Sequence, residues 1–437
     1  MHARTRPRLA VLGLDGLSLN LARGLSASGR FPNLASLADS ELASSITAEL
    51  PELSPVNWTS FYTACGPEEH GIYGFSRLDP DSYRLRFVSS EQVLVPSIFD
   101  RLGQHELISK VVNLPNTYPA KPLKGMLIAG FVAPELSRAV YPRALLPRLQ
   151  AEGYQLEADT SRGLADPEHL LSQLTSTLAS RRMALDLLWP DLAWDLFVFV
   201  LTETDRLNHF LYPALVSENH AWHSACMDVL ALWDRLIGDF LDRFEALAEP
   251  KRLLVLADHG FAELVTEVDL NAWLMEHGFL ALRGTPQDEL DVSVLNTESS
   301  AFALDPGRIY MHARDRYARG WLSADQAAGL REDIRHGLLE LRYEGKPVFQ
   351  EVFRGEDLYP GSRHPDRPDL VCQANPGFDC KAKLDRDRVF GYFGRTGTHT
   401  RDGAFFFDSS GRTVASVRGV GQEVLAFFHP AKPKVLI

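Results

Sequence analysis

Short apolar runs of strand length alternate with helical patterns along this chain, and that alternation limits the fold more than any other feature. The strand candidates lie at 8–14, 107–114, 125–130, 196–201 and 252–257. Between the last two, apolar residues recur at spacings of three and four from Cys226 to Phe244, as one face of a helix requires, with Asp234 and other charged residues on the opposite, solvent-facing side. Strands joined by helices of this length predict an α/β fold with a mainly parallel sheet covered on both faces.

Acidic residues follow three of these strand candidates. Asp15 comes directly after 8–14, Asp258 directly after 252–257, and Asp205 four residues after 196–201. The carboxyl ends of parallel strands form the ligand crevice of such sheets. We therefore expect the three carboxylates to meet at one edge of the sheet.

The net charge of the chain limits the classes of ligand that it can bind. The 437 residues carry 45 Lys+Arg against 57 Asp+Glu, a net charge of −12. This balance argues against binding to a nucleic-acid duplex but is compatible with a small phosphorylated substrate, because a local cation can override the overall field. We expect a single domain over 1–437, with the less regular 265–395 as a subdomain within it.

The apolar runs also bear on location. None approaches the roughly 20 residues of a membrane span. The basic N-terminus leads into too short an apolar run for a secretory signal. The four cysteines show no close paired spacing, which is typical of reduced thiols. We expect a cytoplasmic protein with no membrane association, and no pattern indicates a particular oligomeric state.

Histidines accompany the acidic residues. Asp205 and His209 lie four apart at the start of a predicted helix, so both project from one face. His259 follows Asp258, and His399 lies in the polar, glycine-containing stretch GRTGTHTRDG. Imidazole and carboxylate groups together are the donors typical of a two-metal site for phosphoryl chemistry.

The segment LSPVNWTSFYTACGPEEHGIYGF (53–75) resembles the nucleophile segment of the alkaline phosphatase superfamily. The most similar branch is the type I phosphodiesterase and nucleotide pyrophosphatase group, with its predicted phosphohydrolase and phosphomutase relatives. In this resemblance Ser54 holds the nucleophile position. Further matching positions are Asn57, Thr63-Ala64 where Thr-Gly is usual, Pro67, His70-Gly71-Ile72, LGLDG at 12–16, VNLPNTYPAKPLKGMLIAGF at 112–131, TETDRLNHF at 202–210, ADHGF at 257–261 and GTH at 397–399.

The resemblance implies a three-layer α/β sandwich of the alkaline phosphatase type and a metal-dependent phosphoester hydrolase that forms a phosphoserine intermediate. Two divalent metal ions are expected, with zinc favoured and manganese as the competitor. By position, one ion would be held by Asp15, Ser54, Asp258 and His259, and the other by Asp205, His209 and His399. In the family the His70-Gly71 pair shapes its loop and binds no metal.

Some positions depart from the family pattern or have less certain roles. Phe75 stands where nucleotide-acting members usually carry Asn, which predicts a poor nucleotide pyrophosphatase. The Phe75 side chain could contact substrate or pack in the core. Candidates for substrate contact are Asn116, Thr117 and Tyr118 at a strand end. Arg363 and His364 in the irregular region are further candidates, but a solvated loop is the favoured interpretation of that pair.

We expect the substrate to be a phosphodiester. A diester needs fewer cationic donors than a monoester, and no arginine clamp is recognisable near the Ser54 segment, whereas Phe75 and Tyr73 could form an apolar wall. Two alternatives remain open. A phosphomutase would use the same serine and metals, and a non-catalytic phospholigand-binding protein would keep the fold without the reaction.

Overall fold

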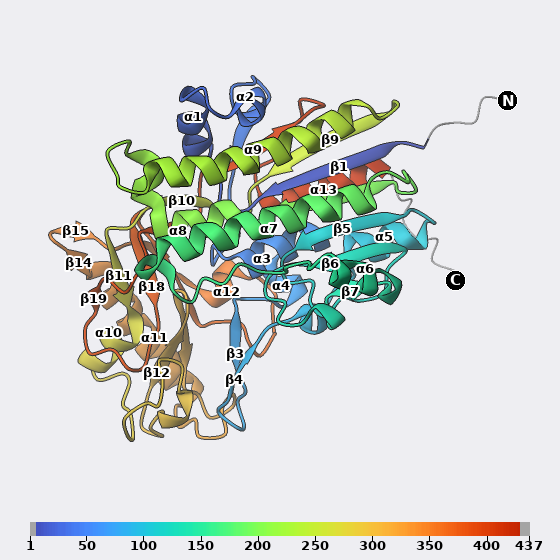
Figure 1. Ribbon diagram of the computed structural model, residues 1–437. Helices are drawn as coiled ribbons and strands as arrows, with labels where there is room; N and C mark the ends of the chain where they lie inside the picture. Colours follow the sequence, from blue (N-terminus) through green and yellow to red (C-terminus); the bar gives the residue numbers. More distant parts are fainter. Residues whose placement is uncertain (1–5, 429–437) are drawn as a thin grey trace, which may run out of the picture.

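The computed structural model describes residues 6–428, and its largest element is an eight-stranded sheet (Figure 1). The strand order is β2-β21-β9-β1-β8-β5-β6-β7. The five strands from β9 to β6 are parallel to one another. The pairings outside them, β2 with β21, β21 with β9 and β6 with β7, are antiparallel. Their bounds are β2 Ala43–Ile46, β21 Ala404–Asp408, β9 Lys251–Leu256, β1 Arg8–Leu14, β8 Leu196–Leu201, β5 Ser109–Leu114, β6 Gly125–Ala129 and β7 Val140–Tyr141.

Helices cover both faces of this sheet. One layer contains α7, α8 and α9, and the other contains α3, α5 and α13 (Figure 1). The predicted three-layer α/β sandwich with a mainly parallel sheet is therefore confirmed. The bounds are α7 Pro167–Leu188, α8 Glu203–Val216, α9 His223–Glu245, α3 Ser54–Thr63, α5 Ile98–Gln104 and α13 Val417–Phe428, with shorter helices α1 Leu19–Ala27, α2 Pro32–Ala38, α4 Pro67–His70 and α6 Leu146–Ala151.

Helix α9 contains the predicted amphipathic stretch, with one exception on its polar face. Asp234, expected in solvent, is only 2% exposed. Its carboxylate accepts hydrogen bonds from the backbone N–H groups of Asn33 and Leu34, at 3.4 and 2.7 Å. These groups begin α2 and have no partner within that helix, so a buried carboxylate satisfies them.

A second hydrophobic core occupies most of 265–395 and lies below the large sheet in Figure 1. A four-stranded sheet of order β12-β13-β17-β16 forms its centre, and all its pairs are antiparallel. Helix α10, Leu270–Glu276, lies at the start of this part of the chain. The other bounds are β12 Ala301–Leu304, β13 Arg308–Met311, β17 Leu370–Ala374, β16 Phe349–Arg354, α11 Ala324–Glu340 and α12 Gly355–Leu358.

Smaller strands join this second core to the large sheet. Strand β10 (Gly260–Glu263) pairs with β20 (Gly397–Thr400), directly after the strand end that carries Asp258. The remaining pairs are β11 Thr266–Asp269 with β18 Phe378–Lys381 and β19 Phe390–Gly391, β3 Ser76–Leu78 with β4 Leu85–Phe87, and β14 Arg342–Tyr343 with β15 Lys346–Pro347. Within residues 6–428, no helix has the length and apolar character that crossing a membrane requires.

Candidate metal centre

The predicted acidic residues meet at the carboxyl ends of three adjacent strands. Asp15 follows β1, Asp258 follows β9, and Asp205 lies in the first turn of α8 after β8. His209 is one helical turn beyond Asp205, and His259 follows Asp258 in the chain. His399 arrives from β20, where it pairs with Phe261 of β10. All three carboxylates and all three imidazoles predicted from the sequence therefore meet at one edge of the sheet.

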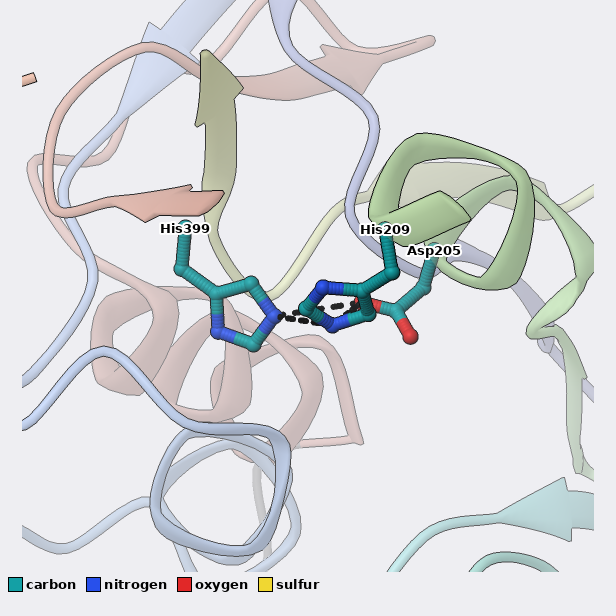
Figure 2. A group of neighbouring side chains, drawn as sticks. All are labelled: Asp205, His209 and His399. Carbon is teal, nitrogen blue, oxygen red and sulfur yellow. Dashed lines mark hydrogen bonds and ion pairs between the residues drawn. The ribbon is translucent and has the colours of Figure 1, made fainter. Parts of the chain in front are cut away.

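The six side chains form two groups of three that could each hold a metal ion. In the first, Asp205 Oδ1 lies 3.3 Å from His399 Nε2 and 3.4 Å from His209 Nε2, and the two imidazole nitrogens are 3.0 Å apart (Figure 2). Figure 2 shows the two imidazoles and the carboxylate turned toward one another.

The second group comprises Asp15, Asp258 and His259. His259 Nε2 lies 3.4 Å from Asp258 Oδ2 and 3.8 Å from Asp15 Oδ1. The two groups adjoin, because the rings of His259 and His399 stack with their centres 3.6 Å apart. The grouping is the same as the one that the family resemblance implies.

One oxygen of each carboxylate is anchored and the other is not. Trp58 Nε1 donates to Asp15 Oδ2 at 2.9 Å, the Gly16 N–H to Asp258 Oδ1 at 3.2 Å, and Arg206 to Asp205 Oδ2 at 2.7 Å. The second oxygens, Asp15 Oδ1, Asp258 Oδ2 and Asp205 Oδ1, are buried without a hydrogen-bond partner. Burying such oxygens unpaired is costly, and divalent cations would offset that cost. The residues present therefore fit metal ions.

The pKa shifts of the three carboxylates reflect their burial and their closeness to one another. Burial, with Asp258 and Asp205 nearby, raises the pKa of Asp15 well above its usual value. Burial and the charge of Asp205 raise the pKa of Asp258 to about 7. Burial opposes ionisation of Asp205 as well, but His209, His399 and Arg206 hold its pKa well below the usual range. A divalent cation beside Asp15 and Asp258 would favour the ionised form of both carboxylates.

The histidines are arranged as metal-binding imidazoles. Burial lowers the pKa of His209, His259 and His399, which favours the neutral form that binds metal. His399 Nδ1 lies 2.7 Å from the Glu52 carbonyl, and His259 Nδ1 lies 3.1 Å from the Gly260 carbonyl. Carbonyls accept only, so both Nδ1 atoms carry the proton and both Nε2 atoms face the centre as acceptors.

Ser54 lies at the edge of the second group. It is the first residue of α3, is 5% exposed, and has its Oγ 3.4 Å from His259 Nε2. Pro55 at the second position suits a helix start, and the N-terminus of a helix favours negative charge nearby. Trp58, one turn later on the same helix, is the residue that anchors Asp15. Helix α3 therefore positions the serine and a metal-group carboxylate together.

The other candidates for substrate contact have different positions. The Asn116 amide donates to Thr59 Oγ1 at 2.8 Å, and Thr117 Oγ1 donates to the Leu114 carbonyl at 2.6 Å. The ring of Tyr118 lies 5.5 Å from the Arg138 guanidinium. None of Asn116, Thr117 and Tyr118 lines the cavity beside the histidines. The structure does not bring these three to the metal centre.

Phe75 does reach the centre. A cavity of about 110 Å³ beside His209 and His399 adjoins an apolar one of about 250 Å³, and Phe75 lines both. Its ring packs edge to face on Phe131, with centres 5.6 Å apart. Tyr73, by contrast, is 2% exposed and its hydroxyl is 2.7 Å from Ser362 Oγ. The expectation that Tyr73 forms part of an apolar wall is wrong, because this side chain lies in the core.

Sequence reasoning missed the two cations that line the smaller cavity. Arg395 lines both cavities, with Nη1 3.3 Å from His209 Nδ1, and Lys381 lines the smaller one. Both come from the irregular 265–395 part of the chain, and no local motif marks them. The sequence therefore shows no arginine clamp near the Ser54 segment, but the folded protein brings Lys381 and Arg395 to the cavity beside the histidines. Trp58 was also missed, although its position one helical turn after Ser54 is a local signal that could have indicated it.

The family model for type I phosphodiesterase / nucleotide pyrophosphatase matches residues 9–403. The chain therefore belongs to the type I phosphodiesterase/nucleotide pyrophosphatase family, and it is an enzyme that acts on phosphoesters.

Solved structures agree on the fold. Phosphonoacetate hydrolase from Sinorhizobium meliloti 1021, in complex with phosphonoformate, matches with a TM-score of 0.64 and 13% identity, over 97% of this chain and 95% of that one. Murine ectonucleotide pyrophosphatase / phosphodiesterase 5 matches with a TM-score of 0.57 and 11% identity over the same shares. No match was found among curated proteins.

Proposed function

We propose that this protein is a metal-dependent phosphodiesterase that uses Ser54 as its nucleophile. One observation carries the proposal. Two groups of metal-binding side chains adjoin the serine, and three of their carboxylate oxygens are buried without a partner. A non-catalytic binding protein would have no use for a buried serine hydroxyl beside two such groups.

The donor set favours two divalent cations. Asp15, Asp258, His259 and Ser54 would hold one, and Asp205, His209 and His399 the other. Imidazole and carboxylate ligands suit zinc first and manganese second. When bound, the two ions supply a lower pKa for the serine hydroxyl and charge compensation at the phosphoryl group.

The reaction itself follows from Ser54. Its Oγ attacks phosphorus, so that an Oγ–P bond forms, the P–O bond to the leaving alcohol breaks, and the serine proton is released as the alcohol takes one up. The N-terminal turn of α3 lies where negative charge develops on the phosphoryl oxygens, which a helix start favours. Water then hydrolyses the phosphoserine, and the products are an alcohol and a phosphomonoester.

The adjoining apolar cavity supports a diester substrate. Phe75, Phe131 and Phe302 are among its lining residues, and an apolar second substituent would bury its surface there. Lys381 and Arg395 would favour a monoester dianion if their charges were free, but Asp379 compensates both. Lys381 Nζ is 2.7 Å from Asp379, and Arg395 is 3.9 Å from the same carboxylate. Phe75 also offers no hydrogen bond to the phosphate of a nucleotide.

A pair of chromogenic esters tests this proposal. We expect the purified enzyme to have a higher kcat/KM for bis(p-nitrophenyl) phosphate than for p-nitrophenyl phosphate, and to release p-nitrophenol and a phosphomonoester. A clearly higher kcat/KM for the monoester would overturn the diester assignment. Conversion of a phosphorylated substrate into an isomer, with nothing hydrolysed, would identify a phosphomutase.

A further inference from the structure

A cavity of about 380 Å³ in the second region shares no lining residue with the two cavities at the metal centre. The start of α11 forms one wall, and the segment GSRHPDRPDL (361–370), which the catalytic function does not use, contributes to another. Its charged lining residues are Arg316, Arg331, Arg363, Arg367, Asp315 and Asp369, with His364 beside them. Arginines thus outnumber acids on its walls.

Two of these arginines are paired with acids. Arg316 Nη1 lies 3.0 Å from Asp369 Oδ2, and Arg331 Nη2 lies 2.9 Å from Glu356 Oε1. Asp369 also accepts a hydrogen bond from the Met311 N–H at 2.7 Å. These contacts compensate the charges of Arg316 and Arg331. They also occupy Asp369, the more buried of the two acids that line the cavity.

The other two arginines have no acidic partner in the described part of the chain. Arg367 Nη1 donates to the Ser362 carbonyl at 3.0 Å, and Arg363 is exposed and makes no hydrogen bond or ion pair with any of residues 6–428. Arg331 adds no free donor of this kind, since its Nε lies 3.7 Å from Glu332 Oε1. Asp315 is exposed like Arg363, so water screens both charges, and this one acid can offset only one of the two unpaired arginines. The cavity therefore keeps an excess of positive charge.

The walls are held in place before any ligand arrives. The Arg316 guanidinium lies 5.0 Å from the ring of Tyr310 and 5.4 Å from that of Tyr317. The hydroxyl of Ser362, which precedes Arg363, lies 2.7 Å from that of buried Tyr73. On the opposite wall, the 17-residue α11 presents the small side chains of Ala324, Ala327 and Ala328. These alanines leave room for a ligand beside a helix start, which adds partial positive charge.

We propose that this cavity binds a small anion with two or more negative charges, separately from the metal centre. Guanidinium groups bind phosphate and carboxylate oxygens through paired N–H donors, and Arg363 and Arg367 offer two such groups. A phosphate ester and a dicarboxylate share the required chemistry, and the cavity has the volume of a small-molecule site.

Equilibrium dialysis of the full-length enzyme against labelled inorganic phosphate tests the site. We expect the wild type to bind one more phosphate per chain than the Arg363→Ala/Arg367→Ala variant, whose affinity at this site should fall about 100-fold. Ala328→Glu, which places a carboxylate in the cavity without removing a contact, should cause the same loss. Both variants should still hydrolyse bis(p-nitrophenyl) phosphate, which shows that they fold.

A matched control is available elsewhere on the surface. Arg23 and Arg388 are exposed and have no described partner, so Arg23→Ala/Arg388→Ala makes the same charge change away from the cavity and should leave phosphate binding intact. Succinate that displaces the additional phosphate indicates a site for doubly charged anions in general, and failure to displace it indicates a phosphate-selective one. Equal phosphate binding by the wild type and the Arg363→Ala/Arg367→Ala variant would overturn the proposal.

Discussion

The large sheet and the second core contribute to the catalytic site in different ways. The seven side chains of the metal centre come from the sheet, from α3 and α8, which adjoin it, and from β20, which pairs with β10. The second core contributes walls to the two cavities, such as Asp305, Cys372, Phe378 and Lys381. The chemistry is therefore concentrated in one region, while the other shapes the space around the substrate.

The difference has a topological cause. Parallel strands all end at one edge, so residues that follow them meet whatever the length of the intervening loops. The second region pairs short strands from distant segments, such as β13 with β17, and nothing local determines which side chains face the cavity. We expect substitutions in the first region to change catalysis and metal binding, and those in the second to change substrate preference.

The largest expected effect concerns Ser54, the proposed nucleophile. Ser54→Ala should lower kcat by roughly 10² to 10⁴, the range seen when a positioned nucleophile or its partner is removed. Metal content should stay largely unchanged, because Asp15, Asp258 and His259 remain. Steady-state kinetics and elemental analysis of the same preparation measure both quantities.

Ser54→Thr is the matched control for this substitution. It keeps a hydroxyl at the start of α3, so measurable activity should remain. Turnover of the alanine variant at the wild-type rate would show that water attacks the substrate directly and that Ser54 is not the nucleophile.

A pair of leucine substitutions compares the two cores directly. Leu254 in β9 and Leu338 in α11 are both 0% exposed, and each change to alanine should lower the free energy of unfolding by about 2–5 kcal/mol. Only Leu254→Ala should also weaken metal binding, because β9 leads directly into Asp258. Leu338→Ala should keep its metal and chiefly raise KM, as the cavity walls loosen.

Chemical denaturation and metal titration of the two variants measure these effects. Loss of metal by Leu338→Ala, to the same extent as by Leu254→Ala, would show that the two cores do not act separately.

A smaller effect concerns His70 in the sheet region. His70 is fully buried, its Nδ1 accepts a hydrogen bond from the Ile72 N–H at 3.1 Å, and burial lowers its pKa to about 3. Below its ordinary pKa of 6.5 the unfolded state binds a proton that the folded state does not, so His70 lowers stability as the pH falls from 6.5 toward 3. In this range His70 contributes about 1.4 kcal/mol per pH unit to the slope of the unfolding free energy against pH.

His70→Asn can accept the same hydrogen bond but does not titrate. The slope of unfolding free energy against pH in the acidic range should therefore be smaller by that amount in the variant. His336→Asn, at an exposed position of α11, serves as the control. An unchanged slope in His70→Asn would mean that His70 is protonated in the folded protein.

The smallest effect is on substrate preference. Phe75→Asn replaces an apolar wall with a hydrogen-bond donor beside the metal centre, so the kcat/KM for a nucleotide diester should rise several-fold relative to bis(p-nitrophenyl) phosphate. Metal content and stability should barely change, since Phe75 is only partly buried. A ratio that does not move, or that moves toward the aryl ester, would remove Phe75 from the determinants of specificity.

Much of the metal centre could be predicted from the sequence because its residues follow strands. Asp15 and Asp258 end apolar runs, and Asp205 and His209 share a helix face, which are local patterns. His399 follows none of the predicted strands and is marked only by its polar, glycine-containing stretch, and its assignment to the ion held by Asp205 and His209 comes from the resemblance to the family. Arg395 could not be found in either way, since its approach to His209 depends on the path of the chain through the second region.

Surface patterns were also incomplete guides to burial. The helical pattern predicts that Asp234 faces solvent, whereas its carboxylate is buried and accepts hydrogen bonds from the N–H groups at the start of α2. Asn116 is a polar residue at a strand end, as ligand-binding residues often are, yet its amide is used within the fold. A periodic pattern predicts which face of a helix or strand a side chain lies on, but it does not predict which neighbouring group forms its hydrogen bonds.

Metal content measured together with activity tests the central claim most directly. We expect the purified protein to contain close to two divalent ions per chain, chelation to abolish hydrolysis of bis(p-nitrophenyl) phosphate, and Zn²⁺ or Mn²⁺ to restore it. The Asp205→Ala and Asp258→Ala variants should each lose one ion. A preparation with far less than one ion per chain that still hydrolyses the ester at the full rate would contradict the account.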